Sequence, residues 1–428
     1  MDLKVEPKSN LKGEIKVSGD KSISHRAVML GAIAEGKTHI EGFLTGEDCL
    51  STAKAFQDLG VKIEGVGEEK MVVHGRGLNG LEEADNVLDF GNSGTTTRLM
   101  MGILAAQDFY TVATGDSSLR GRPMARVTEP LAQMGGSFEG RDNANLLPIT
   151  VLGGNKLEGI KYESSVASAQ VKSAILLAGL WANGVTEVRE PSKSRDHTER
   201  MLEYFGAEIE VDGLTVRVKG GKPLKGNKVV VPGDISSAAF LMVAAMITDG
   251  SELLIKNVGL NPSRYGIIKA LQKMNGNLEL LNERELNGEP VADLLVKSSQ
   301  LKATVIDGDL IPLLIDEIPV LAIAATQAQG KTIIKDAKEL RVKETDRIDA
   351  MVKELRRVGV EVKEREDGME ILGGQKIVGG VTCQSYHDHR IAMSMAIAAL
   401  IAEKPIVIEG AECINISFPN FADLLKSL

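Results

Sequence analysis

The chain repeats one arrangement of apolar and polar positions. An amphipathic run with helical spacing ends at a glycine and leads into a short strand that carries an acidic residue. That glycine is the residue expected just beyond a helix, where a left-handed conformation releases the chain into a strand. Before each run lies a helix of small apolar residues and then a β-branched strand. The pattern occurs in five copies, whose amphipathic runs end at Gly60, Gly135, Gly206, Gly276 and Gly359.

A sixth copy begins at Asp388 and stops inside its second helix at Leu425. Each copy predicts the order strand, buried helix, strand, amphipathic helix, strand, strand. The period of roughly 70 residues is too long for an ordinary solenoid repeat. A lone strand, Glu14 to Val17, precedes the first copy, so we expect the start of the chain to complete its C-terminal half.

The repeat predicts two α/β domains of three units each. One comprises residues 19–232, and the other comprises residues 1–18 together with 233–428. A single large α/β sheet is the alternative. It is disfavoured because no glycine-rich dinucleotide fingerprint follows a first strand.

Composition narrows the class of protein. The chain has 428 residues, 43% of them hydrophobic, and a formal net charge of −9, which argues against a nucleic-acid-binding protein. The most apolar run, Ile391 to Ile401, is about half the length that spans a bilayer, and the N-terminus has no signal-peptide pattern. The separated Cys49, Cys383 and Cys413 form neither a disulfide framework nor a zinc motif. We therefore expect a cytoplasmic protein with no nucleic-acid or membrane partner.

The stretch from Leu340 to Arg347 places basic and acidic groups ahead of an amphipathic helix. If that helix begins by Lys343, then Lys343 and Arg347 share one face with Glu344 beside them. Two cations at an exposed helix start suggest an anion site, and a carboxylate among cations stays ionised and can exchange protons. A solvated, salt-bridged helix start is the alternative. The predicted buried stripe of the helix is Ile348, Met351, Val352 and Leu355.

Small polar residues open the first helix of several copies. Such residues cap helices, and glycine lets backbone N–H groups approach a ligand closely. If related copies point these starts the same way, their positive ends converge on an anion with several phosphates or carboxylates. The four starts are Gly19 to Arg26, Gly91 to Arg98, Ser164 to Gln170, and Gly233 to Ser237. The basic residues nearby are Lys21, Arg26, Arg122, Arg195, Lys343, Arg347 and Arg390.

Two acidic motifs have more than one interpretation. His387-Asp388-His389 can be a metal-binding pair, but Asp388 is better placed as an N-cap of the following apolar helix. Asp316 and Glu317, just before Ile318, can be a paired-carboxylate site or a helix start with its usual acids. We expect neither a metal nor a cofactor.

Six motifs together resemble the 5-enolpyruvylshikimate-3-phosphate synthase family, and the resemblance covers almost the whole chain. The motifs are Gly19 to Arg26, Gly91 to Thr95, Arg120 to Pro123, Ser168 to Gln170, Arg341 to Arg347, and Asp388 to Arg390. The resemblance implies an inside-out α/β barrel of two domains, each with three βαβαββ units. It implies transfer of the enolpyruvyl group of phosphoenolpyruvate to the 5-hydroxyl of shikimate 3-phosphate, on the route to chorismate. The substrates would bind in the cleft between the domains of a monomer, with glyphosate as an inhibitor.

The resemblance also implies roles for individual residues. The catalytic residues would be Asp316, Glu344 and Lys21. Shikimate 3-phosphate would be held by Lys21, Ser22, Arg26, Ser168, Ala169, Gln170, Arg195, Asp316 and Lys343. Phosphoenolpyruvate would be held by Lys21, Gly94, Arg122, Gln170, Arg347 and Arg390. Glu344 would move the proton at C3 of phosphoenolpyruvate, and Asp316 would accept the hydroxyl proton, with help from Lys343 or Lys21.

Some positions differ from the best-known form of the family. Leu99 stands where a proline is frequent, Ala169 replaces a serine, and Ile416 stands where a lysine often binds phosphoenolpyruvate. The segment Ser194 to His197 replaces one that has a tyrosine ligand, so we expect Arg195 to supply the sugar-phosphate contact. These differences resemble the second class of the family, and an alanine at Gly94 would crowd glyphosate.

Two rival functions remain. UDP-N-acetylglucosamine enolpyruvyl transferase shares the fold, but typically has a cysteine in the loop before its Arg-Pro, and Asp116 to Pro123 contains none. A repeat-built binding protein without turnover would have no need of Glu344 among cations.

Overall fold

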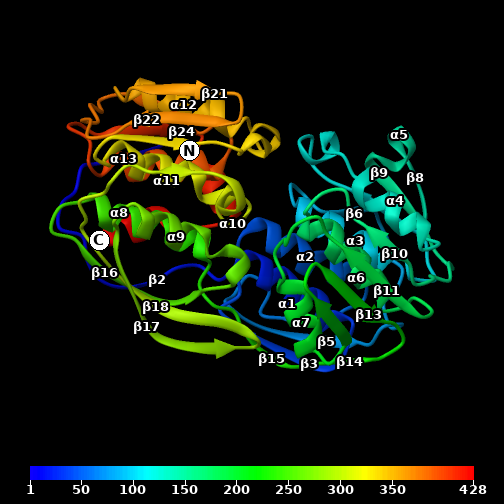
Figure 1. The fold of residues 1–428 in the computed structure, drawn as a ribbon. Coiled ribbons are helices and arrows are strands. Elements are labelled where there is room, and N and C mark those ends of the chain that lie inside the picture. The colour runs from blue at the N-terminus through cyan, green and yellow to red at the C-terminus, as the bar shows by residue number, and fades with distance from the viewer. The chain divides into compact units, whose positions relative to one another are not determined.

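The computed structural model describes all residues from Met1 to Leu428, and the chain divides into two compact units. The N-terminal unit comprises Gly19–Val231 and Leu286–Glu289. The C-terminal unit comprises Met1–Ser18, Pro232–Glu285 and Pro290–Leu428. Each unit has its own hydrophobic core, and Figure 1 shows the helices and strands of each.

Three buried helices lie inside the N-terminal unit: α1 (Lys21–Ala32), α3 (Gly94–Leu104) and α6 (Ala169–Gly179). Their small apolar residues let backbones approach closely. A Cβ atom on Gly102 of α3 would lie 2.1 Å from the carbonyl oxygen of Ala174 of α6, so glycine is required at this crossing. Polar groups of these helices are therefore concentrated at their ends.

Three separate sheets belong to this unit. In each, parallel pairing is followed by two antiparallel pairs, so the three copies share one topology. The first sheet has two parallel pairs, and each of the other two sheets has one. The first sheet contains β14 (Leu224–Lys225), β3 (Ala34–Glu41), β5 (Lys70–Arg76), β4 (Ile63–Glu64) and β15 (Lys228–Val230). The second contains β6 (Leu88–Asp89), β7 (Thr111–Thr114), β9 (Leu146–Leu152) and β8 (Ser137–Gly140). The third contains β10 (Lys161–Glu163), β11 (Val185–Arg189), β13 (Thr215–Lys219) and β12 (Glu208–Asp212).

The C-terminal unit repeats this plan around α8 (Ile235–Ile247), α11 (Ile318–Thr326) and α13 (His389–Ala399), which pack against one another (Figure 1). Its first two sheets contain β2 (Lys12–Lys16), β16 (Glu252–Gly259), β18 (Glu289–Lys297) and β17 (Asn277–Leu286), and then β19 (Val305–Ile306), β20 (Lys331–Ile334), β22 (Gly368–Leu372) and β21 (Val362–Arg365). Its third contains β23 (Thr382–Gln384), β24 (Ile406–Glu409) and β1 (Leu3–Val5). Six sheets exclude the alternative of one large sheet.

The start of the chain contributes to two sheets of the C-terminal unit. The predicted lone strand is β2, and it pairs with β16 of the fourth copy. The strand that joins the incomplete sixth copy is β1, which pairs with β24. The strand β1 was not predicted, because three residues carry too little alternation to identify a strand.

Four of the five predicted left-handed glycines are confirmed: φ is 81° at Gly60, 104° at Gly135, 87° at Gly206 and 91° at Gly359. The prediction is wrong in the fourth copy. There Asn275, with φ of 66°, takes the left-handed position after α9 (Gly266–Lys273), and Gly276 follows it. Asparagine tolerates this conformation better than most residues, so the left-handed residue that ends the helix comes one position earlier than predicted.

No helix of the chain is both long enough and apolar enough to cross a membrane. All three cysteines are buried free thiols.

Candidate active site

In the N-terminal unit, the first cluster of predicted residues lies at the start of α1. Asp20 caps this helix by accepting a hydrogen bond from Ile23 N at 2.9 Å, and Lys21 is the first helical residue. The Lys21 ammonium forms an ion pair with Asp48 of α2 (Glu47–Asp58). The cap fixes the start of the helix, and so places Lys21 and Ser22 in its first turn.

Arg26 follows one turn later and is buried. Its Nε donates to Thr198 Oγ1 at 2.7 Å, its Nη2 to Ser173 Oγ at 2.9 Å, and its Nη1 to Ser22 O at 3.0 Å. Burial lowers the pKa of Arg26 to about 10, so the guanidinium remains charged at neutral pH. Three hydrogen bonds therefore fix the orientation of this cation.

The start of α3 brings a second cluster together. Gly94 is the first helical residue after the cap Ser93, and a Cβ atom there would lie 3.0 Å from Arg98 Nη1 and 3.6 Å from Arg122 Nη1. Arg98 Nη1 also donates to Gln170 Oε1 at 2.8 Å. Gly94, Arg122 and Gln170 are thus gathered around Arg98. Arg98 ends the predicted start Gly91 to Arg98, but it was not among the basic residues expected at the site.

The start of α6 carries the third cluster. Ser168 is the N-cap, and its hydroxyl accepts a hydrogen bond from Val171 N at 3.4 Å. Ala169 and Gln170 are the first two residues of the helix. Gln170 Nε2 also donates to Thr95 Oγ1 at 3.2 Å, which links this start to that of α3.

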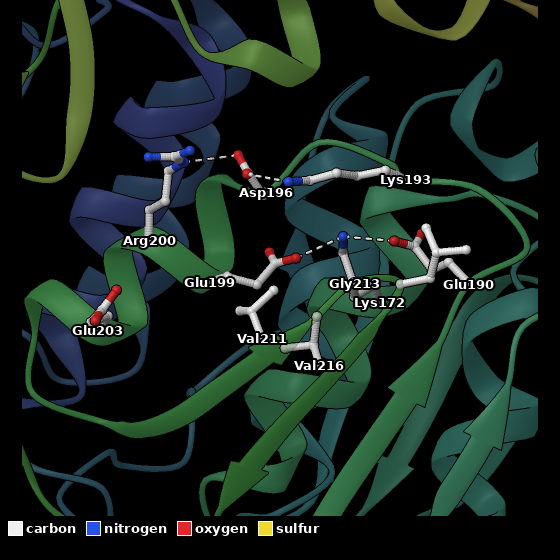
Figure 2. Close-up of a pocket in the computed structure, with 11 residues that line it drawn as sticks. Lys172, Glu190, Lys193, Asp196, Glu199, Arg200, Glu203, Val211, Gly213 and Val216 are labelled. Atoms are coloured by element: carbon white, nitrogen blue, oxygen red, sulfur yellow. Dashed lines mark hydrogen bonds and ion pairs between the residues drawn. The ribbon is translucent and has the colours of Figure 1, made fainter. Parts of the chain in front are cut away.

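Arg195 lies, partly exposed, in the loop between β11 and α7 (His197–Tyr204). Beside this loop is a cavity of about 260 Å³ that none of the predicted residues lines. Figure 2 shows Lys172 of α6 between two carboxylates there, with distances of 2.7 Å to both Glu190 Oε2 and Glu199 Oε1. This buried ion cluster links α6 to Glu190, at the start of the loop, and to Glu199 of α7, the helix that follows the loop.

The charge balance of this cluster explains its pKa shifts. Burial lowers the pKa of Lys172, but Glu199 and Glu190 outweigh it, and the net shift is upward. Burial raises the pKa of Glu199, and the opposing effect of the Lys172 ammonium is too small to cancel it. The cluster was not predicted from the sequence, because its members come from three separate segments of the chain.

In the C-terminal unit, the predicted residues converge on Arg347, whose side chain is 1% exposed. Its Nε lies 2.7 Å from Asp388 Oδ2, its Nη1 3.2 Å from Asp316 Oδ1, and its Nη2 2.6 Å from Glu344 Oε2. Burial disfavours the charge of Arg347, but these carboxylates outweigh it and raise its pKa. Both predicted catalytic carboxylates therefore contact the same cation.

Glu344 is held ionised by its surroundings. Burial raises its pKa, but the Arg347 guanidinium and then His389 outweigh this effect and leave the pKa well below the usual range of a glutamate. The Lys343 ammonium lies 3.8 Å from Asp316 Oδ1 and 3.0 Å from Glu339 Oε1. The prediction of a carboxylate among cations is confirmed.

The predicted helix start at Lys343 is wrong, because α12 spans Arg347–Arg357. Asp346 caps it by accepting hydrogen bonds from Ile348 N at 3.1 Å and Asp349 N at 3.0 Å. Lys343 and Glu344 lie in the segment between α12 and the preceding 3-10 helix η5 (Lys338–Val342). The predicted apolar stripe of this helix is buried, which confirms the helical period.

Asp388 has two functions, of which one was predicted. It caps α13, accepting from Arg390 N at 2.8 Å, and it also binds Arg347. Arg390 Nη1 in turn donates to the carbonyl oxygen of Asp316 at 2.9 Å. No group of three or more His, Cys, Asp or Glu side chains is arranged to hold a metal.

Asp316 and Glu317, in the short 3-10 helix η4 (Ile315–Glu317), point to different partners. Asp316 pairs with Arg347, whereas the buried Glu317 accepts from Ser236 Oγ and lies 3.7 Å from Arg390 Nη1. They are therefore not a proton-sharing pair, and the helix α11 begins immediately after them. Ile416, the position where a lysine is frequent, packs against the core of this unit.

Comparison with known proteins identifies the family. The model of the EPSP synthase (3-phosphoshikimate 1-carboxyvinyltransferase) family matches residues 5–425. The chain belongs to the EPSP synthase family. A 3-phosphoshikimate 1-carboxyvinyltransferase of Petrotoga mobilis is 56% identical over 429 residues, which cover 100% of this chain and 99% of that protein.

Solved structures agree with this membership of the EPSP synthase family. An EPSP synthase from Acinetobacter baumannii has a TM-score of 0.92 at 47% identity, covering 100% of this chain and 98% of that one. The enolpyruvyl transferase NikO from Streptomyces tendae has a TM-score of 0.81 at 16% identity over 100% of this chain and 97% of that one. NikO shows the fold alone, and the predicted enolpyruvyl transferase fold is confirmed.

The Lys172 cluster generates a stability prediction. Lys172→Met leaves Glu190 and Glu199 buried without their cation, so we expect a loss of about 3–5 kcal/mol in the free energy of unfolding, measured by urea denaturation. The triple variant Lys172→Met, Glu190→Gln, Glu199→Gln removes the uncompensated charge and should recover most of it. A Lys172→Met chain as stable as the wild type would contradict the assignment.

Proposed function

We propose that this chain transfers the enolpyruvyl group of phosphoenolpyruvate to the 5-hydroxyl of shikimate 3-phosphate and releases phosphate, in aromatic amino acid biosynthesis. The observation that carries this function is the family match over residues 5–425. The site residues of both units act on the same pair of substrates. Since all of them come from one chain, no second copy is needed, and three free cysteines suit a reducing cytoplasm.

Shikimate 3-phosphate binds to the residues at the starts of α1 and α6. Arg26 supports this assignment because its remaining N–H groups can donate to a phosphate while three others hold its orientation. Lys21 adds a second cation, and the helix starts add backbone N–H groups. The residues assigned to this substrate are Lys21, Ser22, Arg26, Ser168, Ala169, Gln170, Arg195, Asp316 and Lys343.

Phosphoenolpyruvate binds to the arginines of both units. Its phosphate and carboxylate suit the planar guanidinium group, which donates two parallel hydrogen bonds to such anions. Gly94 supports the assignment, since the absence of a side chain keeps space open beside Arg98 and Arg122. The residues assigned to this substrate are Lys21, Gly94, Arg122, Gln170, Arg347 and Arg390.

The two carboxylates around Arg347 divide the proton transfers. The proton of Glu344 adds to C3 of phosphoenolpyruvate, positive charge develops at C2, and the 5-hydroxyl oxygen attacks C2 while its proton passes to Asp316. The tetrahedral intermediate then loses the C3 proton to Glu344, the C2=C3 bond forms again, and the C2–O bond to phosphate breaks. Arginines neutralise the anionic groups in both steps.

Substrate preference tests this function. Purified chain mixed with phosphoenolpyruvate should release phosphate with shikimate 3-phosphate and not with UDP-N-acetylglucosamine. Release with the nucleotide sugar alone would favour the rival enzyme. Binding of both substrates without any release would favour a binding protein.

The acid–base assignment predicts the behaviour of Glu344→Gln. An amide cannot exchange the C3 proton, so we expect turnover to fall about 10²- to 10⁴-fold, with both substrates still bound. Steady-state phosphate release measures the loss. The matched control is Glu366→Gln, whose carboxylate side chain is 80% exposed and pairs with Lys338. Full turnover of Glu344→Gln would contradict the role.

We also propose glyphosate as a competing anion at the phosphoenolpyruvate site. In Gly94→Ala the new methyl group would contact Arg98 Nη1 at 3.0 Å, so the inhibitory concentration should rise. Inhibition of phosphate release at fixed phosphoenolpyruvate measures this rise, and Gly121→Ala, where the added Cβ meets nothing within 4 Å, is the control. An unchanged inhibitory concentration would contradict the proposal.

A further inference from the structure

The two terminal nitrogens of Arg347, which would bind the substrate carboxylate, are occupied by the two carboxylates proposed to be catalytic. Its Nη1 faces Asp316 at 3.2 Å and its Nη2 faces Glu344 at 2.6 Å, while Asp388 accepts from Nε at 2.7 Å and from Nη2 at 3.4 Å. With 1% of its side chain exposed, Arg347 is not accessible to an incoming carboxylate in this arrangement. One of the three anions has to move before phosphoenolpyruvate can bind.

Glu344 is the anion that can move most easily. Asp388 is 0% exposed and also caps α13, so its movement would disrupt a helix. Asp316 is 15% exposed and lies in the turn of η4. Glu344 is 33% exposed and lies outside any helix, two residues after Val342, which is 79% exposed.

We propose that phosphoenolpyruvate displaces Glu344 from Arg347, and that the displaced carboxylate then takes up from solvent the proton that it delivers to C3. This inference rests on the proposed function. In the displaced state the positive charge of Arg347 is shared with the substrate carboxylate, and a second anion stands beside Glu344. Both changes favour the protonated glutamate.

The surroundings of Glu344 are consistent with this exchange. The charged or titratable groups that act on it come from η4, α12 and α13: Asp316, Arg347 and His389. Lys343 of its own segment pairs with Asp316 and Glu339 instead. Without substrate, the cations keep Glu344 ionised, and it cannot act as an acid. The acid therefore forms only when its substrate is present.

Proton uptake measures the exchange directly. Phosphoenolpyruvate is titrated into the enzyme with a shikimate 3-phosphate analogue that lacks the 5-hydroxyl, so that no attack follows. Calorimetry in two buffers of different ionisation enthalpy gives the number of protons taken up. At about pH 8 a phosphate monoester is already fully ionised, because its second pKa is about 6. We expect uptake that approaches one proton per substrate bound, and almost none in Glu344→Gln.

Infrared difference spectra identify the protonated group. Wild-type enzyme and Glu366→Gln should gain the carbonyl band of a protonated carboxyl, and Glu344→Gln should not. Equal proton uptake in wild type and Glu344→Gln, together with normal phosphate release from shikimate 3-phosphate, would overturn the exchange and leave the proposed function intact. A chain that neither binds phosphoenolpyruvate nor releases phosphate would overturn both.

Discussion

The buried charge of Arg347 is the constraint on which the C-terminal unit depends. An isolated guanidinium out of water is strongly destabilising, and the energy is recovered only when carboxylates with good geometry surround it. Here η4, α13 and the segment before α12 each bring one carboxylate to it. The cation thus holds three parts of the chain around one point. Two of its three carboxylates, Asp316 and Glu344, are also those proposed to transfer protons.

The repeated fold explains why the residues proposed to bind anions lie at helix starts in each unit. Each copy buries its first helix almost completely, so polar side chains have room only at the ends. Caps such as Asp20, Ser93, Ser168 and Asp388 then fix where each helix begins. Basic residues in the first turn add to the positive end of the helix. The body of each helix therefore packs in the core, and its start carries the polar groups.

Local patterns could be predicted from the sequence, and long-range pairs could not. The copies, the capping residues and the buried stripe of α12 all depend on neighbours within a few positions. The pairing of Arg347 with Asp388, 41 residues apart, and that of Lys172 with Glu190 require the folded chain. The errors have local causes: Asp346 is the N-cap that fixes the start of α12, and asparagine replaces glycine after α9.

The most direct test is a structure of the chain with phosphoenolpyruvate and the shikimate 3-phosphate analogue that lacks the 5-hydroxyl. The distance from Glu344 Oε2 to Arg347 Nη2 is 2.6 Å without ligands. The account predicts that it lengthens beyond hydrogen-bonding range and that an oxygen of the phosphoenolpyruvate carboxylate takes its place. A complex in which this ion pair is unchanged, with the substrate carboxylate bound elsewhere, would contradict the account.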